Sequence, residues 1–321
     1  MGFDLASLRT AVARHGRVSR VVVAEIRGSS PREAGAAMLV WADGQSGTIG
    51  GGALEYEAAA AARRQTASAH LSTHALGPDL GQCCGGSVTL LTEVYTASEL
   101  VLLEGRDVIA RPVARVPAGD TDAPLAVHRL LNTARAQGQR PPPQLVQGWM
   151  VEPVYRPTRS LWIWGAGHVG RALVDVLSPL PDLAITWVDV AADRFPDHIP
   201  PQVTRLPAAA PERLVPHVDT EANHLILTYS HQLDLALCHA VLGHGFTFAG
   251  LIGSKTKWAR FRSRLAALGH GPEQIARITC PIGRPDLGKH PHAIAIGVAA
   301  DFMARQQRAD RNTDLNKEHS A

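Results

Sequence analysis

The feature that most constrains the fold of this chain is a glycine motif in its second half. The apolar residues 161–164 run directly into Gly165-Ala-Gly167-His-Val-Gly170, and an apolar helical pattern follows. This order of strand, Gly-x-Gly-x-x-Gly and helix is typical of dinucleotide-binding units. Gly165 would allow the tight turn, Gly167 would let a phosphate approach the backbone, and Gly170 would let the helix pack closely on the strand. The N–H groups at the helix start would then bind an anion, which the helix dipole also favours.

A second apolar run follows at residues 183–190 and contains Asp189 near its end. In dinucleotide-binding units an acidic residue roughly 20 positions after the glycines binds a ribose hydroxyl. We therefore predict a Rossmann-like parallel-sheet domain in which Asp189 has this role. A scaffold of the same fold that binds no nucleotide remains the alternative.

Length and composition limit the class of protein. A chain of 321 residues predicts two domains, and a net charge of +3 without a Lys/Arg cluster argues against nucleic acid as a partner. The histidines show no metal-binding spacing, and the four cysteines are too sparse for a disulfide framework. Neither a signal-peptide pattern nor a run of about 18 apolar residues is present, so we expect a cytoplasmic protein without a membrane partner.

The first half contains a second glycine-rich turn. Strands are expected at residues 20–26 and 37–41, then a hairpin at Asp43-Gly44 with its second arm at residues 47–49. Gly50, Gly51 and Gly52 follow, ahead of an alanine-rich helix predicted over residues 53–69 with Glu55 in its first turn. These glycines would form either a backbone nest for an anion or a flexible turn capped by the helix.

Two adjacent cysteines, Cys83 and Cys84, precede Gly85, Gly86 and a strand expected at residues 88–95. Thiols beside a pliable backbone are suited to act as soft metal ligands in a cleft. No second cysteine pair lies nearby in the sequence, so a four-cysteine zinc site is not expected. The alternative is that small residues merely fill a tight turn.

The remaining segments complete an expected N-terminal α/β domain and the Rossmann-like domain. A strand near residues 107–116 and a helix near 126–136 lead to a linker, which gives domains at 1–157 and 158–305 and a polar, disordered tail at 306–321. Strands at 223–229 and 246–252 are expected to precede helices, with Ser230 as a helix N-cap and a last helix over 293–304. Ser254 and Lys255 would bind an anion at a helix start.

Parallel strands gather ligands at their carboxyl ends. The strand order therefore predicts that one sheet edge carries the following residues: Gly165 to Gly170, Asp189, Ser230, His231, Ser254, Lys255 and Cys280.

Several motifs together resemble the xanthine dehydrogenase accessory protein (XdhC/CoxI) family across both domains. They are Gly28-Ser-Ser-Pro31, Gly35-Ala-Ala-Met38, Gly47-Thr-Ile-Gly-Gly-Gly-Ala-Leu-Glu55, Cys84-Gly-Gly, Gly165-Ala-Gly-His-Val-Gly170, Leu251-Ile-Gly-Ser-Lys-Thr-Lys257 and Cys280-Pro-Ile-Gly283. The chain departs from the usual pattern at residues 228–231 and 284–290.

The resemblance implies a non-catalytic protein that binds the molybdenum cofactor, a pterin with a dithiolene-bound molybdenum and a phosphate. Such proteins shield the cofactor while a cysteine desulfurase adds a sulfido ligand, and then insert it into the xanthine dehydrogenase large subunit. Contacts with cofactor-synthesis proteins and a homo-oligomer are implied as well. The candidate binding residues are Gly50, Gly51, Gly52, Glu55, Cys83, Cys84, Gly165, Gly167, Gly170, Asp189, Ser254 and Lys255, with Cys83 and Cys84 as molybdenum neighbours and a nucleotide in the second domain.

Other classes of protein remain open on the residues alone. An NAD(P)-dependent oxidoreductase would use residues 165–189 for its cofactor and His168 or His231 for proton transfer. A sulfur-transfer or redox protein would use Cys83 and Cys84, although adjacent cysteines pair only with strain. A purely structural interaction protein would leave the glycine turns unexplained.

Overall fold

A computed structural model describes residues 2–77, 85–113, 122–180 and 182–318. The chain divides into two compact units, Met1–Arg156 and Pro157–Ala321, which are described separately below. The N-terminal unit is mixed α/β and the C-terminal unit has a parallel sheet, so the predicted fold class is confirmed.

The first unit is built on a five-stranded antiparallel sheet. Its strands are β1 (Val18–Arg27), β2 (Ala37–Trp41), β3 (Gly44–Gly47), β4 (Ala69–Ala75) and β5 (Ser87–Tyr95), in the order β3-β2-β1-β5-β4. Helix α2 (Gly52–Arg64) packs its apolar residues Leu54, Ala58 and Ala62 on one face. That face carries alternate residues of β1 such as Val21 and Val23, as expected for a strand with one face toward a helix.

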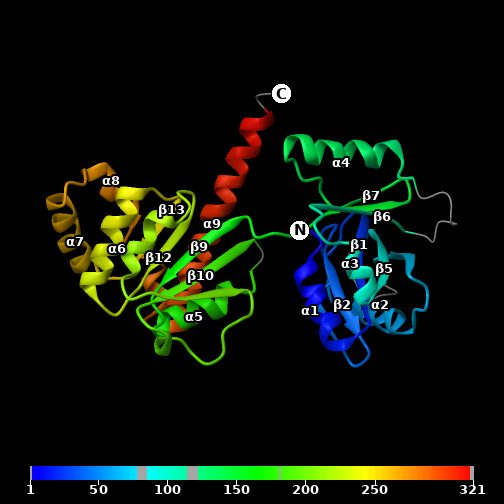
Figure 1. Ribbon diagram of the computed structural model, residues 1–321, viewed down its shortest axis with the longest axis horizontal. Coiled ribbons are helices and arrows are strands. Elements are labelled where there is room, and N and C mark those ends of the chain that lie inside the picture. The colour runs from blue at the N-terminus through cyan, green and yellow to red at the C-terminus, as the bar shows by residue number, and fades with distance from the viewer. Residues whose placement is uncertain (1, 78–84, 114–121, 181, 319–321) are drawn as a thin grey trace. The chain divides into compact units, whose positions relative to one another are not determined.

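A three-stranded sheet packs on the opposite face. It contains β6 (Val108–Pro112), β7 (Gln144–Val146) and β8 (Trp149–Pro153), in the order β6-β8-β7. Helix α4 (Leu125–Gln137) covers its outer side through Val127, as Figure 1 shows. The short helices α1 (Leu5–His15) and α3 (Ala97–Val101) close one end of this unit.

Four charged side chains join the two sheets of this unit. Glu152 on β8 accepts from the two terminal guanidinium nitrogens of Arg20 on β1, Nη1 at 3.0 Å and Nη2 at 2.7 Å, and from Arg111 Nη2 on β6 at 2.5 Å. Arg111 also binds Glu93 on β5 with two bonds. Arg20, Glu93 and Glu152 are all buried. Burial opposes ionisation of Glu152, but Arg20 and Arg111 outweigh it and hold its pKa below the ordinary value.

The second unit contains a six-stranded parallel sheet. Its strands are β9 (Arg159–Trp164), β10 (Leu183–Asp189), β11 (Val203–Pro207), β12 (Asn223–Ile226), β13 (Phe248–Leu251) and β14 (Ile278–Thr279). They lie in the order β11-β10-β9-β12-β13-β14, so the first strand of the unit lies beside the fourth. This is the Rossmann order, whose topological switch point lies between β9 and β12.

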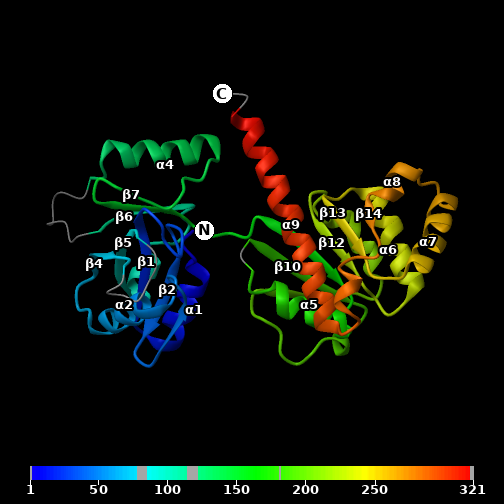
Figure 2. The same ribbon diagram turned by 180° about the vertical axis from the view of Figure 1, so that it is seen from behind.

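Helices cover both faces of the parallel sheet. Helices α5 (His168–Leu177) and α9 (Pro291–Glu318) pack on one face, which Figure 2 shows from behind. The other face is covered by the 3-10 helix η3 (Pro211–His217) with α6 (His231–His244), α7 (Lys255–Ala267) and α8 (Pro272–Ala276). Two apolar cores therefore fix the sheet between helical layers and hold the carboxyl ends of its strands at one edge.

Several predicted boundaries are wrong. The helix predicted over residues 53–69 ends at Arg64, and residues 69–75, for which no strand was predicted, form β4 because β5 offers this segment a full ladder of partners. The second hairpin arm is β3, three residues earlier than expected. Residues 149–153, where no strand was predicted ahead of the linker, form β8. The predicted disordered tail after residue 305 continues α9 to Glu318, since it contains good helix formers and neither Gly nor Pro.

Candidate functional site

The glycine motif of the second unit forms the turn between β9 and α5. Gly165 has φ +122°, and a Cβ there would lie 2.5 Å from the carbonyl oxygen of Leu227. A Cβ on Gly170 would lie 2.0 Å from the carbonyl oxygen of Gly165. Both positions therefore exclude larger residues, as predicted for the tight turn and the close helix packing.

Gly167 has a different environment. It is the N-cap of α5, no side chain caps the helix there, and a Cβ would meet no atom within 4 Å. Among the described residues no side chain caps the start of α5, and Gly167, His168 and Val169 line a cavity, which is an arrangement that can bind an anion at a helix start.

Asp189 ends β10 beneath this turn. Its carboxylate accepts from the backbone N–H of Ala166 and of Val190, both at 2.6 Å, and it is buried. Arg194 Nε lies 3.6 Å from the same carboxylate. Asp189 thus holds the glycine turn in place, while its binding of a ribose hydroxyl stays a prediction.

A cavity of about 290 Å³ lies at the switch point, next to the open end of α5. It is lined by Gly167, His168, Val169, Arg194, Leu227, Thr228, Tyr229 and Ile252. The Arg194 guanidinium lies over the Tyr229 ring, 4.8 Å from its centroid. The cavity therefore offers a helix N-terminus, a cation and an aromatic face, and its volume is near the lower limit of small-molecule sites, about 300 Å³.

A buried ion pair fixes the wall of the cavity formed by β12 and β13. Asp234 on α6 accepts from the N–H and the hydroxyl of Thr228, at 2.9 and 2.8 Å. Lys257 on α7 donates to Asp234 at 2.6 Å and to the carbonyl oxygen of Ile252 at 2.9 Å. Thr228 and Ile252 both line the cavity, so the Asp234–Lys257 ion pair holds these two parts of its lining together.

The serines and lysines of this edge divide into two groups. Ser230 caps α6, as predicted, and Ser254 caps α7 by accepting from Lys257 N–H at 3.1 Å. Lys255 is exposed to solvent, whereas Lys257 turns back over Gly253, where a Cβ would lie 2.7 Å from the lysine Cδ. Sequence reasoning therefore chose Lys255 and missed Lys257. Gly253 lies four residues before Lys257, and a glycine at this spacing leaves room for the lysine side chain to fold back toward the preceding strand.

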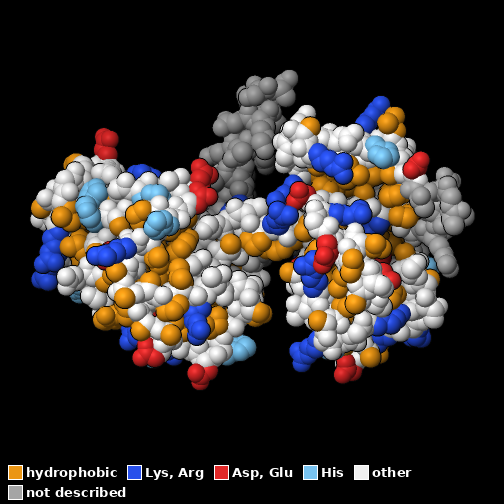
Figure 3. All heavy atoms as spheres, in the orientation of Figure 1, with side chains coloured by type: hydrophobic (Ala, Val, Ile, Leu, Met, Phe, Trp, Pro, Cys, Tyr) orange, Lys and Arg blue, Asp and Glu red, His pale blue; other side chains and the backbone are white. Residues whose placement is uncertain are grey.

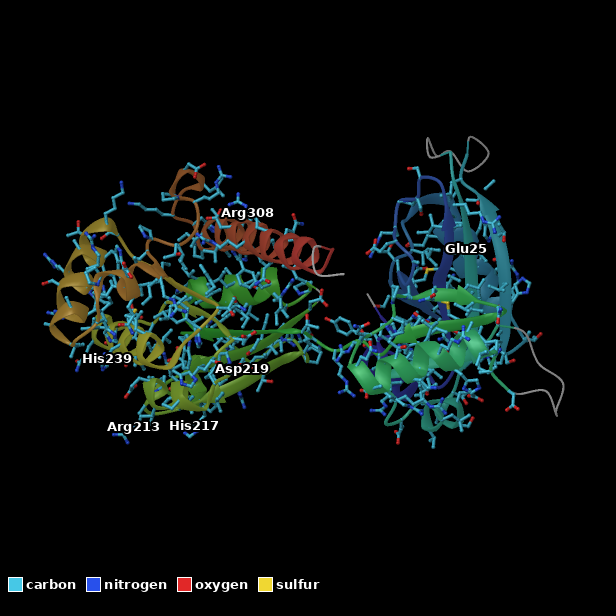
Figure 4. All side chains as sticks on the ribbon, turned by 90° about the horizontal axis from the view of Figure 1, so that it is seen from above. Glu25, Arg213, His217, Asp219, His239 and Arg308 are labelled. Atoms are coloured by element: carbon cyan, nitrogen blue, oxygen red, sulfur yellow. The ribbon has the colours of Figure 1, made fainter. Side chains whose placement is uncertain are left out.

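Cys280 and two histidines, His168 and His231, also lie at this edge. Burial raises the pKa of the half-buried Cys280 thiol to about 11, against the opposing charge of Lys257, so the thiol stays protonated near neutral pH. His168 lines the cavity, and the exposed His231 contacts the Phe261 ring edge-on. On the far side of α6, His239 Nδ1 lies 2.7 Å from His270 Nε2 (Figure 4).

The glycine turn of the first unit already binds an anionic group, the carboxylate of Glu55 from the same chain. Gly50, Gly51 and Gly52 all have positive φ, as expected for a nest. The N–H groups of Ile49 and Gly51 donate to the Glu55 carboxylate at 3.0 Å, and the Thr48 hydroxyl donates to it as well. Burial raises the pKa of Glu55, but these hydrogen bonds outweigh it and the net shift is downward.

Two other motifs of the first unit lie against this turn. A Cβ on Gly50 would be 2.7 Å from Pro31, and a Cβ on Gly86 would be 2.3 Å from the carbonyl oxygen of Ser29. The turn after β1 therefore lies between the triple glycine and the residues that follow Cys83 and Cys84. The two cysteines themselves lie outside the described residues, so their proposed metal contact stays a prediction. Within the described ranges, no cluster of three or more His, Cys, Asp or Glu side chains could hold a metal ion.

Comparison with known families matches both units. The XdhC Rossmann domain matches residues 161–302, and the XdhC and CoxI family matches residues 11–75. The chain belongs to the XdhC/CoxI family. The cavity and its buried ion pair lie within the residues matched to the Rossmann domain of this family.

Two curated relatives come from Escherichia coli. The molybdenum cofactor insertion chaperone PaoD is 25% identical over 304 residues, which cover 92% of this chain and 85% of PaoD. The uncharacterized protein YqeB is 24% identical over 92% of this chain, which spans only 45% of YqeB. The name of PaoD describes a protein that inserts the molybdenum cofactor, whereas the name of YqeB gives no function.

A solved structure gives the same fold. A crystal structure described as a xanthine dehydrogenase from Bacillus halodurans is 20% identical, with a TM-score of 0.66 over 94% of this chain and 95% of that chain. At this identity the match supports the two-unit fold alone. Among the helices described for this chain, none has the length and apolarity that crossing a bilayer requires.

Proposed function

We propose that this XdhC/CoxI-family protein binds the molybdenum cofactor, protects it, presents it to a cysteine desulfurase for sulfuration and inserts it into the large subunit of a xanthine dehydrogenase. The name of PaoD supports the insertion role, and family membership supports the cofactor. The desulfurase, the identity of the receiving enzyme and a homo-oligomeric state belong to the proposal.

The observation that carries the proposal is the open N-terminus of α5 in the switch-point cavity. A phosphate group would accept from the uncapped N–H groups at Gly167 to Val169, where the helix dipole favours negative charge. Arg194 would add a cation, and the exposed Tyr229 ring would offer a flat face to a pterin. The same features would bind a nucleotide in this unit.

The first unit has a different proposed role. Its glycine turn is occupied by Glu55, so we assign it no phosphate and keep Cys83 and Cys84 as proposed neighbours of the metal. Thiols suit molybdenum or its sulfido group as soft neighbours.

The test is cofactor retention under anaerobic conditions. The protein is mixed with molybdenum cofactor and desalted, and molybdenum and pterin are quantified against protein. The parent should retain near-equal amounts. Arg194→Gln should weaken retention roughly tenfold through loss of a charge-assisted contact. Arg205→Gln, an exposed change on β11 of the same unit, should leave it unchanged.

The thiols are tested separately with the double variant Cys83→Ser and Cys84→Ser. If this variant retains cofactor as tightly as the parent, the thiols are not metal neighbours. If neither the parent nor any variant retains cofactor, the chaperone function is wrong.

The second candidate is an NAD(P)-dependent oxidoreductase, which the Rossmann strand order and the cavity at its switch point favour. His168 lies at the cavity, but inside the turn where a pyrophosphate would bind. A nicotinamide titration followed by an absorbance scan separates the two candidates. We expect no hydride transfer, and tight nicotinamide binding with turnover would favour the oxidoreductase.

A further inference from the structure

The outward face of α7 has an unbalanced charge. Lys255, Arg260, Arg262 and Arg264 are exposed, and the helix contains no acidic residue. Within the described parts of the chain, none of these four side chains makes an ion pair or a hydrogen bond. Figure 3 shows basic side chains gathered at the outer edge of the second unit, where Figure 1 places α7.

The charges border a stripe of small residues. At 3.6 residues per turn, Lys255 and Arg262 lie along one side of the exposed face, and Arg260 and Arg264 lie along the other. Between them lie Thr256, Ala259, Ser263, Ala266 and Ala267, all exposed. A partner backbone can therefore approach α7 closely while cations flank it on both sides.

Part of this charge destabilises the helix that carries it, although the helix dipole favours Arg264 in the last turn. Lys255 is in the first turn, where the helix dipole disfavours a cation, and no acidic residue compensates it. Arg260 and Arg264 are four residues apart and repel each other. Negative charge from outside the chain would relieve both effects.

The position of α7 connects this face to the candidate site. The N-cap of the helix, Ser254, comes two residues after Ile252, which lines the switch-point cavity. Lys257, on the inner side of the same helix, fixes that wall by its bonds to Asp234 and Ile252. A partner bound along α7 would therefore start beside the mouth of the cavity.

We propose that the outward face of α7 is the docking surface for an acidic protein segment on the molybdenum enzyme that receives the cofactor. The proposal rests on the chaperone function above. Charge complementarity supports the docking surface, because carboxylates on a partner would pair with the four exposed cations of this helix. A membrane would instead require several large apolar side chains facing outward, whereas Phe261 and Leu265 of α7 are buried, Trp258 packs against the core, and only Leu268 at the end of the helix is exposed.

The test reverses two charges of α7 and measures transfer of the cofactor to the receiving enzyme. The variant Arg260→Glu with Arg264→Glu is compared with Arg205→Glu with Arg213→Glu, which makes the same charge change at two other exposed arginines of this unit. Arg213 points away from the body of the unit in Figure 4. Each cofactor-loaded protein is mixed with the apo-enzyme, and retention, binding and transfer are measured over a range of salt concentrations.

We expect the α7 variant to retain cofactor like the parent while its association with the apo-enzyme slows roughly ten- to a hundredfold, with a weaker salt dependence. The control variant should transfer like the parent. Equal transfer by both variants, or an equal loss in both, would overturn the docking surface. Loss of retention in the parent itself would instead remove the chaperone function.

A second measurement does not need the enzyme. Immobilised poly-L-glutamate, double-stranded DNA and anionic lipid vesicles are offered to the same three proteins at low salt. Binding to poly-L-glutamate that the α7 variant loses and the control keeps is the expected result. Preferential binding of DNA or vesicles through α7, or no α7-dependent binding at all, would show that the proposed partner class is wrong.

Discussion

At the scale of single residues, the glycines of the β9–α5 turn are required for two different reasons. Gly165 and Gly170 are crowded by backbone atoms, whereas Gly167 faces open space at the start of α5. The first two therefore affect folding, and the third affects what can approach the helix. One substitution at each kind of position separates these effects.

Gly170→Ala should destabilise the protein by about 1–3 kcal/mol, because its methyl group would overlap the carbonyl oxygen of Gly165. Gly167→Ala should cost less, at most about 1 kcal/mol, since its φ of −71° suits any residue and only the preference for glycine over alanine at an N-cap is lost. Urea unfolding measures both. An equal loss at the two positions would contradict the geometry of the turn.

His224 should make the stability of the second unit depend on pH. It is fully buried on β12, its Nδ1 accepts from Trp164 Nε1 at 3.1 Å, and burial lowers its pKa to about 4. Between pH 6.5 and about 4 the unfolded chain binds a proton that the folded chain refuses, so stability falls as the pH drops through this window. The free energy of unfolding should fall by about 3 kcal/mol in total across this pH window.

The check on His224 is urea unfolding at pH 7 and pH 5. His224→Phe should be less stable than the parent at pH 7, because Trp164 loses its acceptor, but this difference should shrink at pH 5. His217→Gln, at an exposed position, should keep the pH profile of the parent. A constant difference between His224→Phe and the parent would show that His224 does not titrate in this window.

At the scale of elements, the two sheets of the first unit meet through the buried charges of Arg20, Glu93 and Glu152 and the partly buried charge of Arg111. Glu152→Gln should cost about 3–5 kcal/mol, because it leaves the buried Arg20 and the partly buried Arg111 with less compensation. The exposed pair Arg9–Glu104 is the control, and Glu104→Gln should cost no more than about 1 kcal/mol. Denaturant unfolding that shows similar costs would contradict the structural role of the buried group.

Elements could be predicted where local pattern and tertiary packing agree. The apolar runs at β9, β10 and β12 are buried strands in the fold as well, and the glycine turn after β9 has the geometry that its sequence requires. Residues 69–75 have no pattern of their own and become β4 only because β5 is beside them. Their strand depends on residues more than ten positions away, which single-sequence reasoning does not see.

The sequence predicted the backbone turns of the candidate site, but few of the side chains that line it. The turns at Gly165 and Ser254 follow from sequence, but Arg194, Tyr229 and Lys257 reach the cavity or its wall through tertiary placement. The same holds for Glu55, whose position in the first turn of α2 was predicted from the helix dipole. That its carboxylate folds back onto the preceding glycine turn was not.

At the scale of the whole molecule, each unit has apolar cores of its own, and the chain divides after Arg156. We therefore predict that residues 157–321 fold cooperatively when expressed alone. Circular dichroism with thermal unfolding checks this, and residues 1–156 provide the matched fragment. A second-unit fragment without a cooperative transition would show that its stability depends on the first unit.

The carboxylate of Glu55 has a consequence for any ligand of the first unit. A free phosphate that approached Gly51 would compete with an anion tethered a few bonds away, whose effective concentration is of millimolar order or higher. Dilute phosphate compounds in solution would lose that competition. Acid weakens this advantage, because a protonated Glu55 carries no charge and accepts more weakly from the two N–H groups. The turn therefore excludes stray anions at neutral pH, and no tethered competitor of this kind caps the start of α5.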